Sequence, residues 1–240
     1  MNKVLPAQLS QSEPLAADFR YELKLASDSI SPAQARSWLR LHPEGFRVAF
    51  PPRMINNLYF DTVDLQSFND NLSGVSARRK LRIRWYGPMD GGTVDDPVLE
   101  LKIKENMLGT KKQQRLGVAL DLTRPFTEIW RRIHAHANEE WQSRMLAFTQ
   151  PTLINRYRRE YFVTPDAAVR ATLDYDLAAY EQRMSPRPNL SRRLPQPATV
   201  VIEVKTAPDH QKRLQHIMGF FPIGRSRSSK YVSGVLGGTF

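Results

Sequence analysis

The chain has 240 residues, with 35 lysines and arginines against 24 aspartates and glutamates, so its formal net charge is +11. This balance favours phosphate-rich partners: nucleotides, polyphosphate, nucleic acid or an anionic membrane surface. The absence of cysteine excludes a disulfide framework and a thiolate metal site. No apolar run approaches the ~18 residues of a membrane span. Residues 1–17 lack the apolar core of a secretory signal, so we expect a loose tail there and a cytoplasmic protein.

Local signals in chain order predict strands that alternate with helices. Ser31 followed by Pro32 is an N-cap with proline at the first helical position. We expect strands over residues 19–25, 57–61, 78–86, 98–104, 114–120, 153–163, 169–175 and 199–205. Helices are expected over residues 32–41, 62–72, 125–148 and 208–218, and a last one begins near residue 228.

Six segments in these strands place charged residues at every second position, with apolar residues between them. They are Arg20–Lys24, Arg78–Arg84, Glu100–Lys104, Tyr157–Tyr161, Arg170–Asp174 and Glu203–Lys205. Because successive side chains of a strand point to opposite faces, each segment has a charged face, and most have an apolar face as well. One polar surface of the sheet therefore carries many cations and a few carboxylates, which indicates a polyanion-binding surface.

The expected fold class is α+β, with a mostly antiparallel closed β-barrel of about eight strands. Periodicity alone does not decide whether the charged faces line the interior of such a barrel or its outside. The apolar strand faces must pack on something, however, and the helices are the available partners. We therefore expect the helices outside the barrel and the charges inside it.

Three strands carry a glutamate two positions before a lysine: Glu22 with Lys24, Glu100 with Lys102, and Glu203 with Lys205. The two members of each pair share a strand face. Carboxylate oxygens suit Mg²⁺ or Mn²⁺, and these ions usually also bind substrate phosphates. The alternative is a cross-strand lattice of salt bridges. Three such pairs, each opposite an apolar face, favour a site.

The cations follow the same alternation. Lys80, Arg82 and Arg84 share one face, Tyr157, Arg159 and Tyr161 share another, and Arg170 lies on one face with Asp174. The planar fork of arginine matches phosphate oxygens in pairs, whereas lysine is a point charge. Inside a closed sheet these cations would repel one another unless an anion lay among them, so anion binding should stabilise the protein.

A further basic run, Lys111, Lys112 and Arg115, is either another cluster at a strand start or a solvated turn. The sequence has neither a glycine-rich phosphate loop nor a dinucleotide-binding fingerprint. Phosphate handling would therefore depend on side-chain cations and a carboxylate-held metal.

Eight motifs occur in an order that resembles the VTC domain, the catalytic part of the vacuolar transporter chaperone complex and of stand-alone bacterial relatives, within the wider CYTH or triphosphate tunnel superfamily. The motifs are Tyr21–Lys24, Asn57–Thr62, Arg82–Gly87, Glu100–Lys102, Tyr157–Phe162, Arg170 with Leu173 and Asp174, Val201–Lys205 and Ser229–Tyr231. The resemblance implies one tunnel domain over residues 18–240 with a basic lumen. It also implies polyphosphate synthesis from ATP with Mn²⁺ or Mg²⁺.

The resemblance assigns roles to matching positions. Phosphates would bind to Lys24, Arg82, Arg84, Lys102, Arg159 and Lys230, with Lys80, Arg170 and Lys205 as further candidates. Glu203 would be the principal metal ligand, assisted by Glu22 or Glu100, and Ser229 would add a hydroxyl contact. The register of the basic strand after Lys104 is unclear, so only Arg115 carries over from it.

The implied ligands are ATP and pyrophosphate or polyphosphate. A separate membrane protein is a plausible partner and would hold the chain at the inner membrane face. Three rival functions stay open: a metal-dependent triphosphatase with the same residues, a non-catalytic polyphosphate-binding module, and a nucleic-acid binder. The last is the least favoured, because its cations should form an outer stripe rather than strand-alternating faces.

Overall fold

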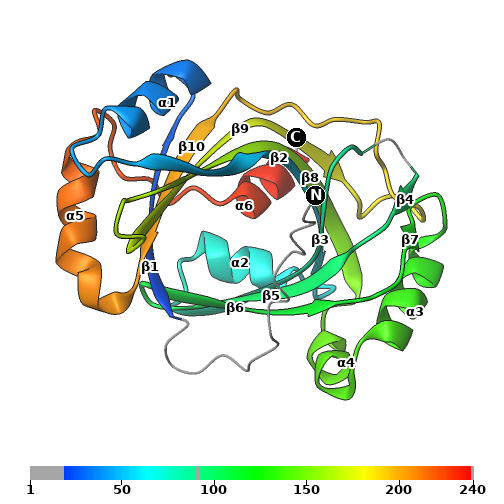
Figure 1. Ribbon diagram of the computed structural model, residues 1–240. Helices are drawn as coiled ribbons and strands as arrows, with labels where there is room; N and C mark the ends of the chain where they lie inside the picture. Colours follow the sequence, from blue (N-terminus) through cyan, green and yellow to red (C-terminus); the bar gives the residue numbers. More distant parts are fainter. Residues whose placement is uncertain (1–18, 90–91, 239–240) are drawn as a thin grey trace, which may run out of the picture.

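A ring of antiparallel strands organises the computed structural model, which describes residues 19–89 and 92–238 (Figure 1). The strands of the ring are β1 (Arg20–Ser27), β2 (Arg47–Asp61), β3 (Ala77–Tyr86), β5 (Val98–Glu105), β6 (Leu108–Arg115), β8 (Gln150–Val163), β9 (Val169–Glu181) and β10 (Val200–Thr206). Their order is β1-β10-β9-β8-β2-β3-β5-β6, and the ladder between β6 and β1 closes the barrel. The expected α+β fold with a closed antiparallel barrel is confirmed.

The remaining elements connect or cover this barrel. A small second sheet pairs β4 (Thr93–Val94) with β7 (Leu120–Asp121). The helices are α1 (Pro32–Arg40), α2 (Gln66–Leu72), α3 (Phe126–His136), α4 (Glu139–Met145), α5 (Gln211–Gly219) and α6 (Lys230–Leu236), with a 3₁₀ turn η2 (Pro208–His210) before α5. Among the described residues, none of these helices is long and apolar enough to cross a membrane.

Apolar side chains on the outward faces of several strands lie under helices. In Figure 1, α1 and α5 lie against one side of the barrel, and α3 and α4 lie at the opposite side. The first pair packs Leu39 and Ile217 against Ile202 and Val204, and the second pair packs Ile133 and Trp141 in the cluster that holds Leu81, Ile83 and Leu101. Burying these apolar faces fixes which face of each strand turns inward.

Helix α6 packs differently from these four. It lies within the ring of strands in Figure 1, where Tyr231 and Val235 contact the inward-facing residues Tyr59, Leu153 and Ala179. The rings of Tyr231 and Tyr59 stack with centroids 4.9 Å apart. One end of the barrel is therefore filled by the last helix of the chain, whereas the sequence predicts all helices outside.

The buried carboxylate of Asp61 anchors this plug. It accepts hydrogen bonds from the Tyr231 hydroxyl at 2.5 Å and from the backbone N–H groups of Ser67 and Phe68 at 2.8 and 3.0 Å. Asp61 is fully buried. One side chain thus joins α6 to the first turn of α2 and to the end of β2.

Several predicted elements have other bounds in the structure: β2 begins at Arg47 instead of residue 57, β9 ends at Glu181 instead of residue 175, and α2 begins at Gln66 instead of residue 62. Two further predicted elements differ more. The strand expected over residues 114–120 is wrong, because β6 begins at Leu108, directly after a tight turn in which Asn106 has a φ of 55°. The single helix expected over residues 125–148 is two helices, since Ala137 is extended and the Asn138 side chain caps α4 by accepting from the Trp141 N–H. The predicted tail, residues 1–17, lies outside the described residues.

The plug makes Gly234 a sensitive position. A Cβ atom on Gly234 would lie within van der Waals overlap of the Leu153 Cδ2 atom. We expect Gly234→Ala to lower the free energy of unfolding by about 1–3 kcal/mol, the usual cost of overpacking, measured by urea unfolding.

The matched control is Gly219→Ala, where an added Cβ meets no atom within 4 Å. In a Leu153→Ala background the cost of Gly234→Ala should largely vanish, because the clash partner is gone. Equal stability of Gly234→Ala and wild type would contradict this packing of α6.

Candidate functional site

The inward faces of the barrel gather a set of charged side chains that we call the lumen cluster. Its cations are Lys24, Lys80, Arg82, Arg84, Lys102, Lys111, Arg159, Lys205 and, from α6, Lys230, and its carboxylates are Glu22, Glu100, Asp174 and Glu203. Nine cations less four carboxylates leave a formal excess of five positive charges in this cluster. Cross-strand register places these residues side by side, as in Lys24↔Glu203 and Lys80↔Lys102.

Glu100 is the most enclosed carboxylate of the cluster. It is fully buried, forms ion pairs with Arg82 and with Arg84 (3.5 Å), and accepts a hydrogen bond from Gln113 at 3.0 Å. Burial alone would raise the pKa of Glu100, but the Arg82 and Arg84 guanidinium groups hold that pKa well below its usual range. Glu100 thus stays ionised and fixes the two arginines.

Glu22 and Glu203 form a second group on neighbouring strands. Lys205 Nζ lies 2.5 Å from Glu203 and 3.7 Å from Glu22, and Lys24 Nζ lies 3.1 Å from Glu22 and 3.9 Å from Glu203. Lys102 adds a contact to Glu22 at 2.9 Å. Burial would raise the pKa of both carboxyl groups, yet the lysines lower both, so both are carboxylates at neutral pH.

Asp174 joins the barrel wall to the plug. Arg159 donates two hydrogen bonds to it, at 2.6 and 2.7 Å, and Lys230 Nζ lies 2.6 Å from its Oδ2 atom, which also accepts one of these bonds. The Arg159 Nη2 atom also lies 3.8 Å from Glu203. Through these contacts the first residue of α6 becomes part of the cluster.

Lys80 has no carboxylate partner within ion-pair distance among the described residues. Its Nζ donates to the Ser229 hydroxyl at 2.8 Å and lies 5.6 Å from the Tyr231 ring centroid. Burial, together with the charges of Lys102 and Lys24, lowers its pKa well below the ordinary value. The buried Arg82 Nε and Thr172 Oγ1 atoms also lack hydrogen-bond partners. Such unsatisfied groups indicate a place for an anion.

The structure brings together most of the predicted site residues. Lys24, Lys80, Arg82, Arg84, Lys102, Arg159, Lys205, Lys230, Glu22, Glu100 and Glu203 all belong to the lumen cluster, and Ser229 borders it through Lys80. Two residues stand apart. Arg115 is at the end of β6, where its side chain is 69% exposed and pairs with Asp96. Arg170 is exposed at the start of β9 and has no ion pair in the described part of the chain.

Lys111 is a lumen residue that the sequence left unassigned. The short turn after Glu105 sets the register Lys102↔Lys111 and Glu100↔Gln113, so Lys111 faces the lumen and lies 3.9 Å from Glu100. Lys112 points the other way and pairs with Glu140 of α4 at 2.9 Å. The signal for this turn was Asn106 alone, because asparagine tolerates the positive φ that the turn requires.

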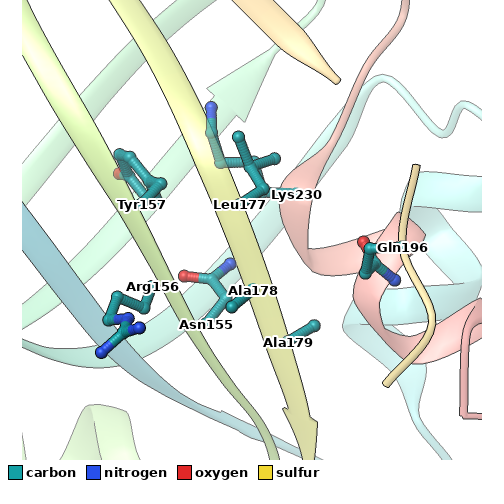
Figure 2. Close-up of a pocket in the computed structure, with 8 residues that line it drawn as sticks. All are labelled: Asn155, Arg156, Tyr157, Leu177, Ala178, Ala179, Gln196 and Lys230. Carbon is teal, nitrogen blue, oxygen red and sulfur yellow. The ribbon is translucent and has the colours of Figure 1, made fainter. Parts of the chain in front are cut away.

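A small pocket opens behind Lys230, between β8, β9 and the residue 196 loop (Figure 2). Its volume is about 10 Å³, enough for one water molecule but not for a phosphate group. Its lining includes Asn155, whose buried Nδ2 has no partner and whose Oδ1 accepts from Asn57 Nδ2 at 2.8 Å. This pocket beside the plug is therefore too small to be the place where a polyanion would bind.

The sequence matches the VTC domain family over residues 39–237. The chain belongs to the VTC domain family. No curated protein matches the sequence of this VTC domain.

Three solved structures are similar to the VTC domain. A protein from Hippeastrum, described as an adenylyl cyclase with a dominant triphosphatase activity, has 14% identity and a TM-score of 0.46, covering 88% of this chain and 90% of its own. The PH1819 protein from Pyrococcus horikoshii OT3 has 15% identity and a TM-score of 0.47, with 90% and 98% covered. A protein from Vibrio parahaemolyticus described as an adenylate cyclase has 10% identity and a TM-score of 0.48, with 87% and 94% covered.

The unpaired Lys80 gives the first prediction for this site. We expect Lys80→Met to raise the melting temperature of the empty VTC domain, because a buried cation among cations is removed. The same change should shrink the stabilisation by inorganic tripolyphosphate, which for wild type is about 2.7 kcal/mol at 100 times its Kd. Thermal unfolding with and without tripolyphosphate measures both effects.

Lys112→Met is the control, since Lys112 lies outside the lumen. A Lys80→Met protein that is less stable when empty, and equally stabilised by tripolyphosphate, would contradict this view of Lys80.

The lowered pKa of Lys102 predicts that stability and tripolyphosphate affinity depend on pH. Burial lowers its pKa from 10.5 to about 8, despite the opposing charge of Glu22. Folded protein then binds fewer protons than unfolded protein between these values, so the free energy of unfolding should rise from about pH 8 to about pH 10.5. Over the same range Lys102 loses its charge, and tripolyphosphate affinity should fall. Urea unfolding and calorimetric titration across this range test the two opposite slopes, and two slopes of the same sign would be contrary to expectation.

Proposed function

We propose that this VTC domain transfers the γ-phosphate of ATP to pyrophosphate or a growing polyphosphate chain inside the barrel. The observation that carries the proposal is the excess of cations over carboxylates in the lumen cluster, with Lys80 left unpaired. A triphosphate would offset this excess of positive charge. Membership of the VTC domain family also supports the proposal that the substrate is a phosphate chain. A separate membrane protein is the partner that export of the product would require.

The contacts of the lumen side chains suggest different roles for the arginines and the lysines. Arg82 and Arg84 are held by Glu100, and Arg159 is held by Asp174, so these three guanidinium groups are pre-oriented before substrate binds. Pre-oriented donors stabilise charge that develops on the transferred phosphoryl group. The lysines neutralise the remaining phosphate oxygens. No covalent nucleophile is needed, because positioning and electrostatics supply most of the catalysis of phosphoryl transfer.

Glu203 and Glu22 are the residues that would hold a divalent ion. Among the described residues no group of three or more metal-binding side chains lies together. Glu22 and Glu203 are nevertheless adjacent and ionised, and Lys24 and Lys205 each contact both of them. Two carboxylates together with phosphate oxygens are a common ligand set for Mg²⁺ or Mn²⁺. Glu100 is engaged by Arg82 and Arg84 and is the poorer candidate. When bound, the ion would offset negative charge on the phosphates.

A triphosphatase is the second candidate, favoured by one observation. Helix α6 fills one end of the barrel through Tyr231 and Val235, so a long chain has no second exit past this helix as it lies here. Short products of hydrolysis would leave by the mouth through which the substrate entered. The two functions share their residues and differ in the acceptor, which is water or a phosphate chain.

A product assay separates these candidates. Purified protein is incubated with γ-labelled ATP and Mn²⁺, with and without a pyrophosphate primer, and the products are resolved on a gel. We expect a ladder of labelled phosphate chains that the primer increases. Labelled orthophosphate as the single product would contradict the polymerase and support the triphosphatase. The absence of any product would contradict both functions.

Two variants test the assigned roles. Arg82→Ala should reduce turnover by about 10²-fold or more, the usual cost of a lost charge-stabilising donor. Glu203→Gln should abolish metal-dependent turnover while tripolyphosphate binding persists or tightens, because one negative charge leaves the lumen. Lys112→Ala, whose side chain lies outside the barrel, is the control for both. Full turnover of Glu203→Gln with Mn²⁺ would remove the metal role of Glu203.

A further inference from the structure

A group of aromatic side chains around one arginine lies at the end of the barrel away from α6. It consists of Phe50, Arg53, Tyr86 and Tyr161, which we call the rim cluster. Leu153, which contacts the plug, and Tyr161 are eight residues apart on β8, or ~27 Å along a strand. The rim cluster is therefore at the mouth that α6 leaves free.

The rim cluster is built around one guanidinium group. The Arg53 Cζ atom lies 5.8, 5.5 and 5.8 Å from the ring centroids of Phe50, Tyr86 and Tyr161. Phe50 and Tyr161 meet edge to face at 5.9 Å. Arg53 has no ion pair within the described residues, and its cross-strand partner is another cation, Arg159. No carboxylate therefore explains why this arginine is held here.

A β-bulge creates this arrangement. Phe50 pairs with Tyr161 and Arg53 with Arg159, so three positions on β2 match two on β8. Without the extra residue, Phe50 and Arg53 would point to opposite faces of the sheet, because side chains alternate. The residues between them are Pro51 and Pro52, which lack a backbone N–H and are tolerated at such irregularities. The bulge thus turns both side chains toward the mouth.

The cluster is open to a ligand and continuous with the lumen cluster. Phe50 and Tyr86 are 56% and 47% exposed, which is unusual for rings that are already grouped. Tyr86 follows Arg84 by two residues on β3, and Tyr161 follows Arg159 by two on β8, so the Cα atom of each tyrosine lies ~7 Å from that of a lumen arginine on the same strand face. A ligand that reaches both clusters has a flat part and a polyphosphate part.

We infer that the rim cluster binds the base of a purine nucleoside triphosphate whose phosphates occupy the lumen. Nucleobases stack on aromatic rings and on guanidinium planes, and the rim cluster offers both. This inference rests on the proposed function and adds substrate selection to it: the mouth favours ATP or GTP over CTP, UTP and inorganic tripolyphosphate. Because the contacts are stacking faces, the preference is for large bases and not for one base edge.

The test compares ATP, CTP and inorganic tripolyphosphate by calorimetric titration in EDTA, which prevents turnover. In the Phe50→Ala/Tyr86→Ala variant, ATP binding should weaken by about 10-fold or more, as expected for lost base stacking. CTP binding should weaken less, and tripolyphosphate binding should change less than about 2-fold. The preference of wild type for ATP over CTP should disappear.

Two further variants sharpen this test. Arg53→Lys keeps the charge but removes the planar face of the guanidinium group. This variant should therefore bind ATP more weakly and bind tripolyphosphate with unchanged affinity. Val48→Ala alters another exposed apolar residue of β2 that pairs with Phe162 rather than with the rim cluster, and it should change no affinity. Circular dichroism and melting temperature confirm the fold of each variant.

The outcomes separate the two proposals. If the Phe50→Ala/Tyr86→Ala variant binds ATP and tripolyphosphate equally more weakly, or binds ATP as wild type does, the base site is overturned while the lumen function stands. Wild-type protein that binds no tripolyphosphate would contradict the lumen function itself and would overturn the base site with it.

Discussion

Positive charge enclosed in a closed barrel is the constraint on which the rest of the structure depends. Closure of the sheet forces every second side chain of each strand inward, away from bulk water. Arg82, Arg84 and Arg159 are tolerated there because Glu100 and Asp174 pair with them. Lys80 has no such partner, and its pKa falls well below the ordinary value because of burial and the neighbouring lysines. The lumen thus holds buried positive charge that the carboxylates of the chain do not fully offset.

The two ends of the barrel differ, and this asymmetry gives the site a direction. At one end Tyr231 stacks on Tyr59 and is held by Asp61, which closes the interior with the last helix of the chain. Lys230, one residue earlier, reaches Asp174, so closure and charge pairing are made by the same segment. At the other end the aromatic rings around Arg53 stay exposed. A substrate that enters by this mouth would place its phosphates deepest.

Much of this arrangement could be predicted from sequence, because a period of two residues fixes the face of each side chain once a strand is recognised. Alternation in Arg78–Arg84 and Glu203–Lys205 was enough to place cations and carboxylates together and to require helices over the apolar faces. Features that depend on a single residue or on tertiary contacts were not visible. The turn at Asn106 moved β6 and brought Lys111 into the lumen, and Asn138 broke a regular helical pattern by capping α4. The inward packing of α6 depends on Gly234 meeting Leu153, a contact between distant parts of the chain.

A crystal structure with inorganic tripolyphosphate tests the central claim most directly, since it locates the anion without reference to turnover. The result expected is density for three phosphate groups within the barrel, in contact with Lys80, Arg82 and Arg159. It should also show Lys80 Nζ moved from the Ser229 hydroxyl toward a phosphate oxygen. Tripolyphosphate bound only to cations outside the lumen cluster, such as Lys112 on the outer face, with an unchanged lumen, would contradict a polyanion site inside the barrel.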